Sequence, residues 1–327
     1  MKTKRNIFVW CNDFENYTGE GILARNFINK IFSNSSHKIH IRSNNAEYLY
    51  YNRKIKTIRY SKYKNNFINK YIKLFWGIFL IRFHNFYGYK TFYINYLPLW
   101  NFLIFLMLPK NTYLGPITGG THIEKEDGIN YIVRKYFFPI FYKFSSNIIN
   151  KKYDFLMFST EMLRKYLNKE NIKKSLFNLT LICFDNNKKR KIKDIDFLIY
   201  YRKHSNKSNY FLKKITQKLS IQKKVFVAGD KISGKNITNL GNINRDKLFK
   251  YLARTKFSVS SSENFYSLFA LDCIANDVLL FINKKNYLNK NYFPRYSLKT
   301  INFNHFNQSF KQLIRVKKKI KLKKKLN

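Results

Sequence analysis

Two acidic residues frame a short apolar segment near the C-terminus of a strongly basic chain. The segment "SSSENFYSLFALDCIAND" (260–277) carries Glu263 and Asp272. Among 327 residues there are 63 Lys and Arg but only 18 Asp and Glu, which gives a formal net charge of +45. A pair of acids at one junction therefore favours a binding role. The alternative is that Glu263 is solvated in a loop and Asp272 lies on a helix surface.

The pattern around these acids predicts a strand, a polar loop and a helix. "FSVSSS" (257–262) is typical of a strand, and a helix is expected to begin at Ser267. Glu263 would then follow the carboxyl end of a strand, where a carboxylate can reach a ligand. The N–H groups at the start of the next helix favour phosphate binding. We expect Asp272 about 1.4 turns into that helix, near the same end.

Strands and helices alternate along the whole chain, which is typical of parallel α/β sheets. The first series has expected strands at 6–13, 37–43, 90–96, 111–120 and 153–160, and expected helices at 21–32, 97–108 and 161–167. The basic stretch 185–194 interrupts the series, and the alternation restarts with "IDFLIYY" (195–201). We predict an α/β protein with two Rossmann-like doubly wound domains facing a cleft, at 1–188 and 189–312. A basic tail follows at 313–327.

The second half resembles the retaining GT-B glycosyltransferases of group 1 (family 4), from about residue 196 to 283. In that family the first acid of the C-terminal signature contacts the donor sugar, and the second contacts the nucleotide ribose. The amides between them lie near the diphosphate. The resemblance carries these roles to Glu263, to Asp272 and to the start of the helix at Ser267 and Leu268.

The resemblance has three departures within this segment. The second acid is Asp, and eight residues separate it from Glu263 where the family has seven. We expect the extra residue to lie in the loop at 265–266. Asn276 replaces the usual Gly after the helix, and we expect it to take a left-handed conformation, which Asn tolerates.

Two cations follow the strand that opens the second domain. Arg202 and Lys207 have the spacing with which the family holds its diphosphate leaving group, although Tyr201 replaces the usual preceding Gly. Positive charge there would stabilise the charge that develops when a sugar–phosphate bond breaks. In so basic a chain the same spacing also arises by chance. Gly229 and Gly241 match the family's pattern further along.

The resemblance is thinner in the first half. "NDFENYTGEGILARNFI" (12–28) resembles the family's first glycine-rich loop, which implies that Gly19 and Gly21 approach the sugar or the acceptor. "LGPITGGTHIEKEDG" (114–128) resembles a later loop, in which His122 would bind donor or acceptor. A solvated loop histidine is the alternative.

The function implied is a hexosyltransferase-type glycosyltransferase of polysaccharide biosynthesis. It would move a sugar from a nucleotide diphosphate sugar, with retention and without a metal, to a glycan or glycolipid acceptor such as a lipid-linked, lipopolysaccharide or capsule glycan. No cofactor is expected beyond this co-substrate. Three scattered cysteines do not suggest a disulfide framework or a zinc site and fit a cytoplasmic protein.

The alternative function is a non-catalytic basic protein that binds nucleic acid or an anionic membrane through its charge. The placed acids make nucleic acid the less favoured partner. The apolar runs 74–81 and 97–108 are too short to span a bilayer. The helix expected at 66–79 would place Phe75 and Ile78 on one face with Phe67, Tyr71 and Leu74. That face would suit either the protein core or peripheral attachment to the inner face of a membrane.

Overall fold

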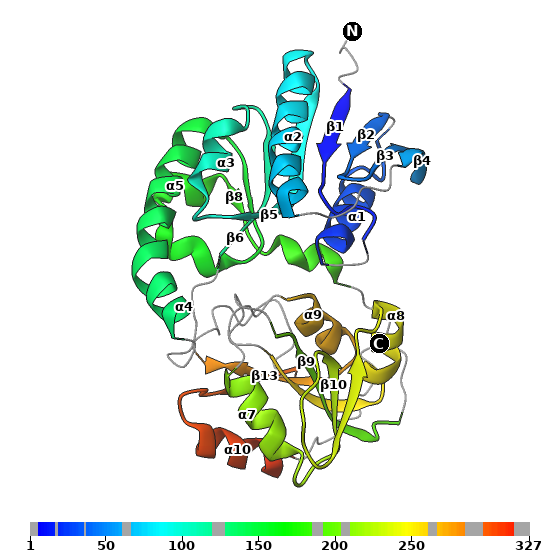
Figure 1. Cartoon of the computed structure of the whole chain (residues 1–327), viewed down its shortest axis with the longest axis vertical. Helices are drawn as coiled ribbons and strands as arrows, with labels where there is room; N and C mark the ends of the chain where they lie inside the picture. The colour runs from blue at the N-terminus through cyan, green and yellow to red at the C-terminus, as the bar shows by residue number, and fades with distance from the viewer. Residues whose placement is uncertain are drawn as a thin grey trace, which may run out of the picture. The chain divides into compact units, whose positions relative to one another are not determined.

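The computed structural model describes residues 6–16, 19–35, 37–60, 67–119, 128–184, 192–203, 210–260, 267–284 and 297–316, with the backbone alone at 67–74. The chain divides into two compact units (Figure 1). The first comprises Met1–Thr121 and Ile132–Cys183, and the second comprises His122–Tyr131 and Phe184–Asn327. Most of the predicted linker at 185–194 lies outside the described residues.

The first unit is built on an eight-stranded sheet of order β4-β3-β2-β1-β5-β6-β7-β8. Its strands are β1 (Ile7–Trp10), β2 (Ile39–Arg42), β3 (Ala46–Tyr51), β4 (Lys54–Tyr60), β5 (Lys90–Pro98), β6 (Tyr113–Thr118), β7 (Leu156–Phe158) and β8 (Ser175–Leu176). The strands β2, β1, β5, β6, β7 and β8 each pair in parallel with the next one in this order. The pairs β2–β3 and β3–β4 are antiparallel.

Helices cover this sheet and bury its apolar faces. They are α1 (Gly19–Ile31), α2 (Phe67–Phe86), α3 (Phe102–Met107), α5 (Phe138–Lys152) and α6 (Lys169–Lys173), with 3-10 turns at Glu161–Tyr166 and Leu179–Cys183. A short helix α4 (Ile129–Ile132) and a π-helical turn (Val133–Phe137) lead into α5. One core joins Ile78 and Ile81 of α2, Phe105 of α3 and Tyr142 of α5 to strands β1, β5 and β6.

The second unit has a six-stranded, fully parallel sheet of order β11-β10-β9-β12-β13-β14. The strands are β9 (Ile195–Tyr201), β10 (Val225–Gly229), β11 (Ile237–Gly241), β12 (Thr255–Val259), β13 (Leu279–Asn283) and β14 (Leu298–Ile301). Its helices are α7 (Tyr210–Leu219), α8 (Arg245–Leu252), α9 (Leu268–Ala275) and α10 (Phe306–Arg315).

The apolar sequence pattern explains why these elements form. Strand β9 is a nearly continuous apolar run, as expected for a parallel strand covered on both faces. Helix α7 buries Phe211, Ile215 and Leu219, which recur at the helical period, and leaves Lys213 and Lys214 exposed. The α/β class with parallel-rich sheets is therefore confirmed.

Two local expectations are wrong. The helix expected from residue 97 begins only at Phe102, because Pro98 still belongs to β5. The spacing of Ile22, Leu23, Phe27 and Ile31 predicts that they share the buried face of α1, but Ile31 is exposed, and Ala24 and Ile28 are buried instead. The β3–β4 hairpin was not predicted. Among the helices that the structure describes, none is both long and apolar enough to cross a membrane.

Helix α10 lies at the end of the described chain and packs against α7. The predicted boundary at residue 312 falls inside this helix, whose Leu313 is fully buried. Phe211 of α7 stacks on Phe303, just before α10, with ring centroids 3.9 Å apart. The last described helix thus belongs to the core of the second unit.

We expect Leu313→Ala to lower the free energy of unfolding by about 2–5 kcal/mol, because it removes a buried side chain and leaves a cavity. The neighbouring Gln312→Ala is the control, since Gln312 is exposed. Urea unfolding followed by circular dichroism measures both. Equal stability of the two variants would show that α10 is not part of the core.

Candidate functional site

Among the predicted site residues that the structure describes, Arg202, Ser267, Leu268 and Asp272 lie at or near the carboxyl edge of the second sheet. Arg202 is exposed and directly follows β9, which lies between β10 and β12. The ends of β9 and β10 are tied together. The backbone N–H of Asp230 donates to the Tyr201 carbonyl at 2.8 Å, and the backbone N–H of Lys203 donates to the Asp230 carboxylate. Arg202 therefore extends from a fixed strand end in the middle of the edge.

Gly229 allows this close approach of β9 and β10. Its φ is +99°, and a Cβ there would lie 2.1 Å from the Tyr201 carbonyl oxygen. Only glycine meets both conditions without strain. Tyr201, which occupies the family's glycine position, is buried beside it. Burial, with a smaller effect of Asp230, raises the pKa of the Tyr201 phenol.

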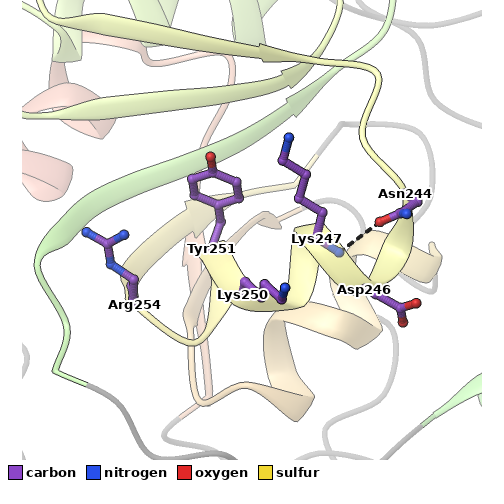
Figure 2. A pocket seen from close by; sticks show the side chains of 6 residues that line it. All are labelled: Asn244, Asp246, Lys247, Lys250, Tyr251 and Arg254. Carbon is purple, nitrogen blue, oxygen red and sulfur yellow. Dashed lines mark hydrogen bonds between the residues drawn. The ribbon is translucent and has the colours of Figure 1, made fainter.

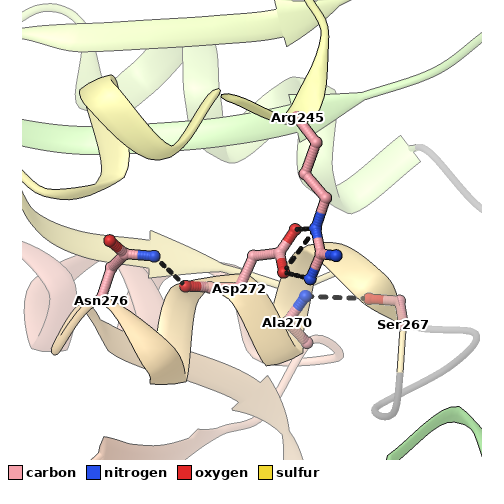
Figure 3. A network of polar contacts seen from close by, with 5 residues as sticks. All are labelled: Arg245, Ser267, Ala270, Asp272 and Asn276. Atoms are coloured by element: carbon pink, nitrogen blue, oxygen red, sulfur yellow. Dashed lines mark hydrogen bonds and ion pairs between the residues drawn. The ribbon is translucent and has the colours of Figure 1, made fainter. Parts of the chain in front are cut away.

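Helix α9 starts at the same edge, one residue later than expected. Ser267 is the N-cap, not the first helical residue, and its hydroxyl accepts a hydrogen bond from the Ala270 N–H at 3.2 Å (Figure 3). Leu268 begins the helix. At the other end, the expectation for Asn276 is wrong: its φ is −99°, and Asp277 takes the left-handed conformation with φ +54°.

Asp272 lies in the second turn of α9 and faces Arg245, the first residue of α8 (Figure 3). Arg245 Nη2 is 2.6 Å from Asp272 Oδ1, and Arg245 Nε is 3.2 Å from both carboxylate oxygens. The Asp272 side chain is 4% exposed and that of Arg245 is 23% exposed. The interpretation of Asp272 as a solvated surface acid is wrong.

Arg245 is the site residue that sequence reasoning missed. It follows the N-cap Asn244, whose side chain accepts from the Lys247 N–H at 2.9 Å, so α8 also begins at the carboxyl edge. The available signal was this placement: α8 and α9 both begin at the carboxyl edge of the same sheet, one starting with Arg and the other carrying Asp. A planar guanidinium matches a carboxylate and fixes its orientation.

In the first unit, close backbone contacts explain why position 21 is a glycine. A Cβ on Gly21 would lie 2.1 Å from the Asn16 carbonyl oxygen and 2.5 Å from that of Asp13. Glycine is thus required by the loop that precedes α1. Gly19 is the first residue of α1. A role of either glycine toward a ligand stays a prediction.

A cluster of polar side chains lies beside this loop, at the carboxyl edge of the first sheet. Trp10 Nε1 donates to Asn12 Oδ1 at 2.7 Å, and the Asn12 N–H donates to Asn95 Oδ1 at 2.7 Å. Asn95 is 4% exposed, and its Nδ2 has no hydrogen-bond partner among the described residues. Glu15 Oε2 is likewise buried and unpartnered in the described part of the chain. Asn95 Nδ2 can donate a hydrogen bond to a hydroxyl, and Glu15 Oε2 can accept one from it.

Three predicted site residues, Glu263, Lys207 and His122, lie outside the described residues. Their roles stay predictions. Within the described ranges, no three His, Cys, Asp or Glu side chains gather in a way that could hold a metal ion.

A hollow runs along the outer side of α8 (Figure 2). It is lined by Asn244, Asp246, Lys247, Lys250, Tyr251 and Arg254. Arg254 immediately precedes β12 and donates from Nε to Asp194 Oδ1 at 2.8 Å, a bond that lowers the pKa of Asp194 to about 2. The hollow therefore extends toward the amino ends of the strands and away from Arg202.

Comparison with solved structures identifies the fold. HepE of Anabaena, in complex with UDP, aligns with a TM-score of 0.53 at 8% identity over 95% of this chain and 89% of its own. The lipopolysaccharide outer core galactosyltransferase WaaB aligns at 0.50 and 9% identity over 94% and 89%. The chain has the GT-B fold.

Other comparisons add less. The chain spans only 54% of the pneumococcal O-GlcNAc transferase GtfA, with 81% of this chain aligned at 13% identity and a TM-score of 0.44. No family model and no curated protein matches the sequence. Sequence identities this low establish the GT-B fold alone and do not establish the function.

The Arg245–Asp272 pair should stabilise the second unit. We expect Arg245→Ala to lower the free energy of unfolding by about 1–3 kcal/mol, because a nearly buried carboxylate loses its bidentate donor. A double-mutant cycle with Asp272→Asn, measured by urea unfolding, isolates the coupling.

Arg254→Ala is the matched control, because its pair with Asp194 is about 40% exposed on both sides. Solvent-exposed pairs contribute little, so the loss should be clearly smaller. Equal losses, or additive effects in the Arg245–Asp272 cycle, would contradict the assignment of this pair.

Proposed function

We propose that this protein is a glycosyltransferase that uses a nucleotide diphosphate sugar. The observation that carries the proposal is the nearly buried Asp272 carboxylate, held by Arg245 at the carboxyl edge of the second sheet. Residues 196–283 resemble the C-terminal segment of the retaining GT-B glycosyltransferases, and this resemblance implies a ribose-binding acid at position 272. The UDP-bound HepE structure, which shares the fold, adds support for a nucleoside diphosphate ligand.

The reaction would break the bond between the sugar's anomeric carbon and the diphosphate oxygen. The electron pair of that bond stays on the diphosphate, and the anomeric carbon forms a new bond to an acceptor hydroxyl oxygen. The proton of that hydroxyl leaves with the diphosphate or to solvent. The free energy barrier depends on stabilising the negative charge that develops on the leaving group.

Arg202 supplies positive charge at the strand end where this leaving group would bind. It is exposed at the centre of the carboxyl edge, and Gly229 holds the adjoining backbone close. In the proposal Lys207 adds a second cation, and Glu263 orients the sugar's hydroxyls. The N–H groups at the start of α9, at Ser267 and Leu268, contribute partial positive charge beside the diphosphate.

Asp272 would accept hydrogen bonds from the ribose hydroxyls. A carboxylate has about four acceptor positions, so the ribose can share it with Arg245. Arg245 then has a positioning role: it fixes the carboxylate before the nucleotide arrives, which lowers the cost of ordering on binding.

The finer parts of the proposal concern stereochemistry, metal and acceptor. We propose a hexosyl transfer with retention, in which Arg202 and Lys207 replace a metal as the counter-charge. The acceptor would be a growing surface glycan, lipid-linked or part of a lipopolysaccharide or capsule. An acceptor of this kind would bring the enzyme to the cytoplasmic face of a membrane. The N-terminal acceptor-side domain (1–188) and the C-terminal nucleotide-sugar domain (189–312) would divide the two substrates.

Thermal unfolding against a panel of nucleoside diphosphates and nucleotide sugars tests the donor. We expect one nucleotide to raise the melting temperature selectively, because a ligand that binds only the folded state stabilises it. Asp272→Asn and Arg202→Ala should each weaken the affinity about tenfold, since each removes a charge-assisted contact.

The control is Lys203→Ala, an exposed cation next to Arg202 that has no proposed contact. It should leave the shift almost unchanged. Stabilisation by any polyanion, such as heparin or nucleic acid, with no effect of Asp272→Asn, would instead identify a charge-driven binding protein.

Slow hydrolysis of the identified donor tests retention and metal independence without knowledge of the acceptor. Nuclear magnetic resonance should show that the first sugar released has the anomeric configuration of the donor. EDTA should not change the rate, because protein cations would balance the leaving group's charge. Release of the opposite anomer, or loss of hydrolysis with EDTA, would reject the corresponding part of the proposal.

A further inference from the structure

Helix α2 presents a row of aromatic side chains to solvent. Phe75, Trp76, Phe79, Phe83 and Phe86 are 54%, 48%, 54%, 47% and 85% exposed. The predicted grouping of Phe75 with Ile78 is wrong, because Ile78 is buried in the core on the other side of the helix. The side chains of Phe67, Tyr71 and Leu74 lie outside the described residues. The core needs only the Ile78 side of α2, so the aromatic row has no packing role there.

Helices α3 and α5 pack beside α2 and expose further apolar side chains. All three helices bury residues in one core of the first unit, so they form one layer (Figure 1). Arg82 Nε of α2 donates to the Met107 carbonyl of α3 at 2.6 Å. Phe102, just beside the exposed Leu103, stacks on Phe141 of α5. We call the exposed apolar side chains of this layer the aromatic face; they are Phe75, Trp76, Phe79, Phe83, Phe86, Tyr87, Leu103, Leu106, Ile140, Phe141 and Phe144.

A hollow within the aromatic face holds two cations. Aromatic side chains of α2 line it together with Arg82, Leu108, Pro109 and Lys152. Lys152 Nζ donates to the carbonyls of Phe105 at 2.9 Å and Leu106 at 2.6 Å, at the C-terminal end of α3. Burial, and then the charge of Arg82, lowers the pKa of Lys152. Two like charges thus lie close enough to repel each other.

Helices α2, α3 and α5 themselves carry no acidic side chain, and the first acid after α5 is the exposed Asp154, two residues beyond Lys152. From Tyr48 to Ile123, and again throughout α5, the chain contains no Asp or Glu. Exposed Lys110, Lys143 and Lys151 add further positive charge on α3's C-terminal flank and on α5. An anion would relieve the repulsion between Arg82 and Lys152, and the aromatic rim would favour an anion attached to an apolar body.

We propose that the aromatic face docks onto the surface of an anionic phospholipid bilayer, with a lipid phosphate between Arg82 and Lys152. Exposed aromatic side chains would enter the headgroup boundary, and the lysines would meet the negative surface. Helix α2 would lie in the plane of the interface, which agrees with the absence of a spanning helix among those described. The inference goes beyond glycosyl transfer and does not require it.

Vesicle co-sedimentation without any nucleotide sugar tests the proposal. Wild-type protein should bind vesicles of phosphatidylcholine with phosphatidylglycerol, and bind pure phosphatidylcholine vesicles far more weakly. Phe79→Ser/Phe86→Ser should weaken binding at least about tenfold, because two apolar side chains no longer leave water. Ile192→Ser/Ile221→Ser is the matched control, since both residues are exposed and lie in the second unit, and it should bind normally.

A second pair of variants separates the contribution of the two cations in the hollow from that of the protein's overall positive charge. Arg82→Gln/Lys152→Gln should weaken binding more than Lys247→Gln/Lys250→Gln, which removes the same charge from α8. Each cation at the membrane surface is expected to contribute about fivefold. Equal effects of the two pairs would show that net charge alone drives binding and would overturn the proposal.

Tryptophan fluorescence reports insertion directly. The emission of the half-exposed Trp76 should shift to the blue on vesicle binding, and Trp76→Phe should lose most of that shift. Size-exclusion chromatography without lipid tests a second copy of the chain as the occupant. A wild-type dimer that Phe79→Ser/Phe86→Ser converts to a monomer, with no vesicle binding, would replace the membrane by self-association.

Discussion

The position of β9 at the centre of the second sheet governs what the candidate site can hold. Parallel strands end on the same edge, and the helix that follows each strand begins there. Because β9 lies between β10 and β12, Arg202 emerges in the middle of that edge. Gly229 lets the neighbouring backbone close against Tyr201. The starts of α8 and α9 are brought near enough for Arg245 to hold Asp272.

Acidic residues are scarce in this chain, so the ion pairs that they form are informative. Several of the described carboxylates are engaged with cations: Asp272 with Arg245, Asp194 with Arg254, and Asp196 with Lys256. Of these, Asp272 is the least exposed and the one at the carboxyl edge. The remaining positive charge creates a long-range field that would draw anionic substrates and anionic surfaces alike. The candidate site lies in the second unit, and the aromatic face lies in the first.

Much of the fold was predictable because burial left a strong apolar pattern. Strand β9 and helix α7 were found from such patterns. The β4 strand was not, because every residue in it is exposed and its sequence carries no core-facing alternation. The left-handed residue after α9 was misplaced by one position, since an Asn and an Asp stand side by side and either tolerates that conformation. Arg245 was missed because one arginine among 63 basic residues carries no signal until its helix is placed.

The exposed hairpin strand β4 gives the positive charge another consequence. It forms the outer edge of the first sheet, and its backbone could in principle pair with a strand of another molecule. It carries Lys54, Lys56 and Arg59 together with Ile55 and Ile58, and all of these side chains are exposed. A second copy approaching this edge would bring the same cations, and like charges opposite each other destabilise strand pairing. We therefore expect the charge of this hairpin to disfavour edge-to-edge pairing between copies of the chain.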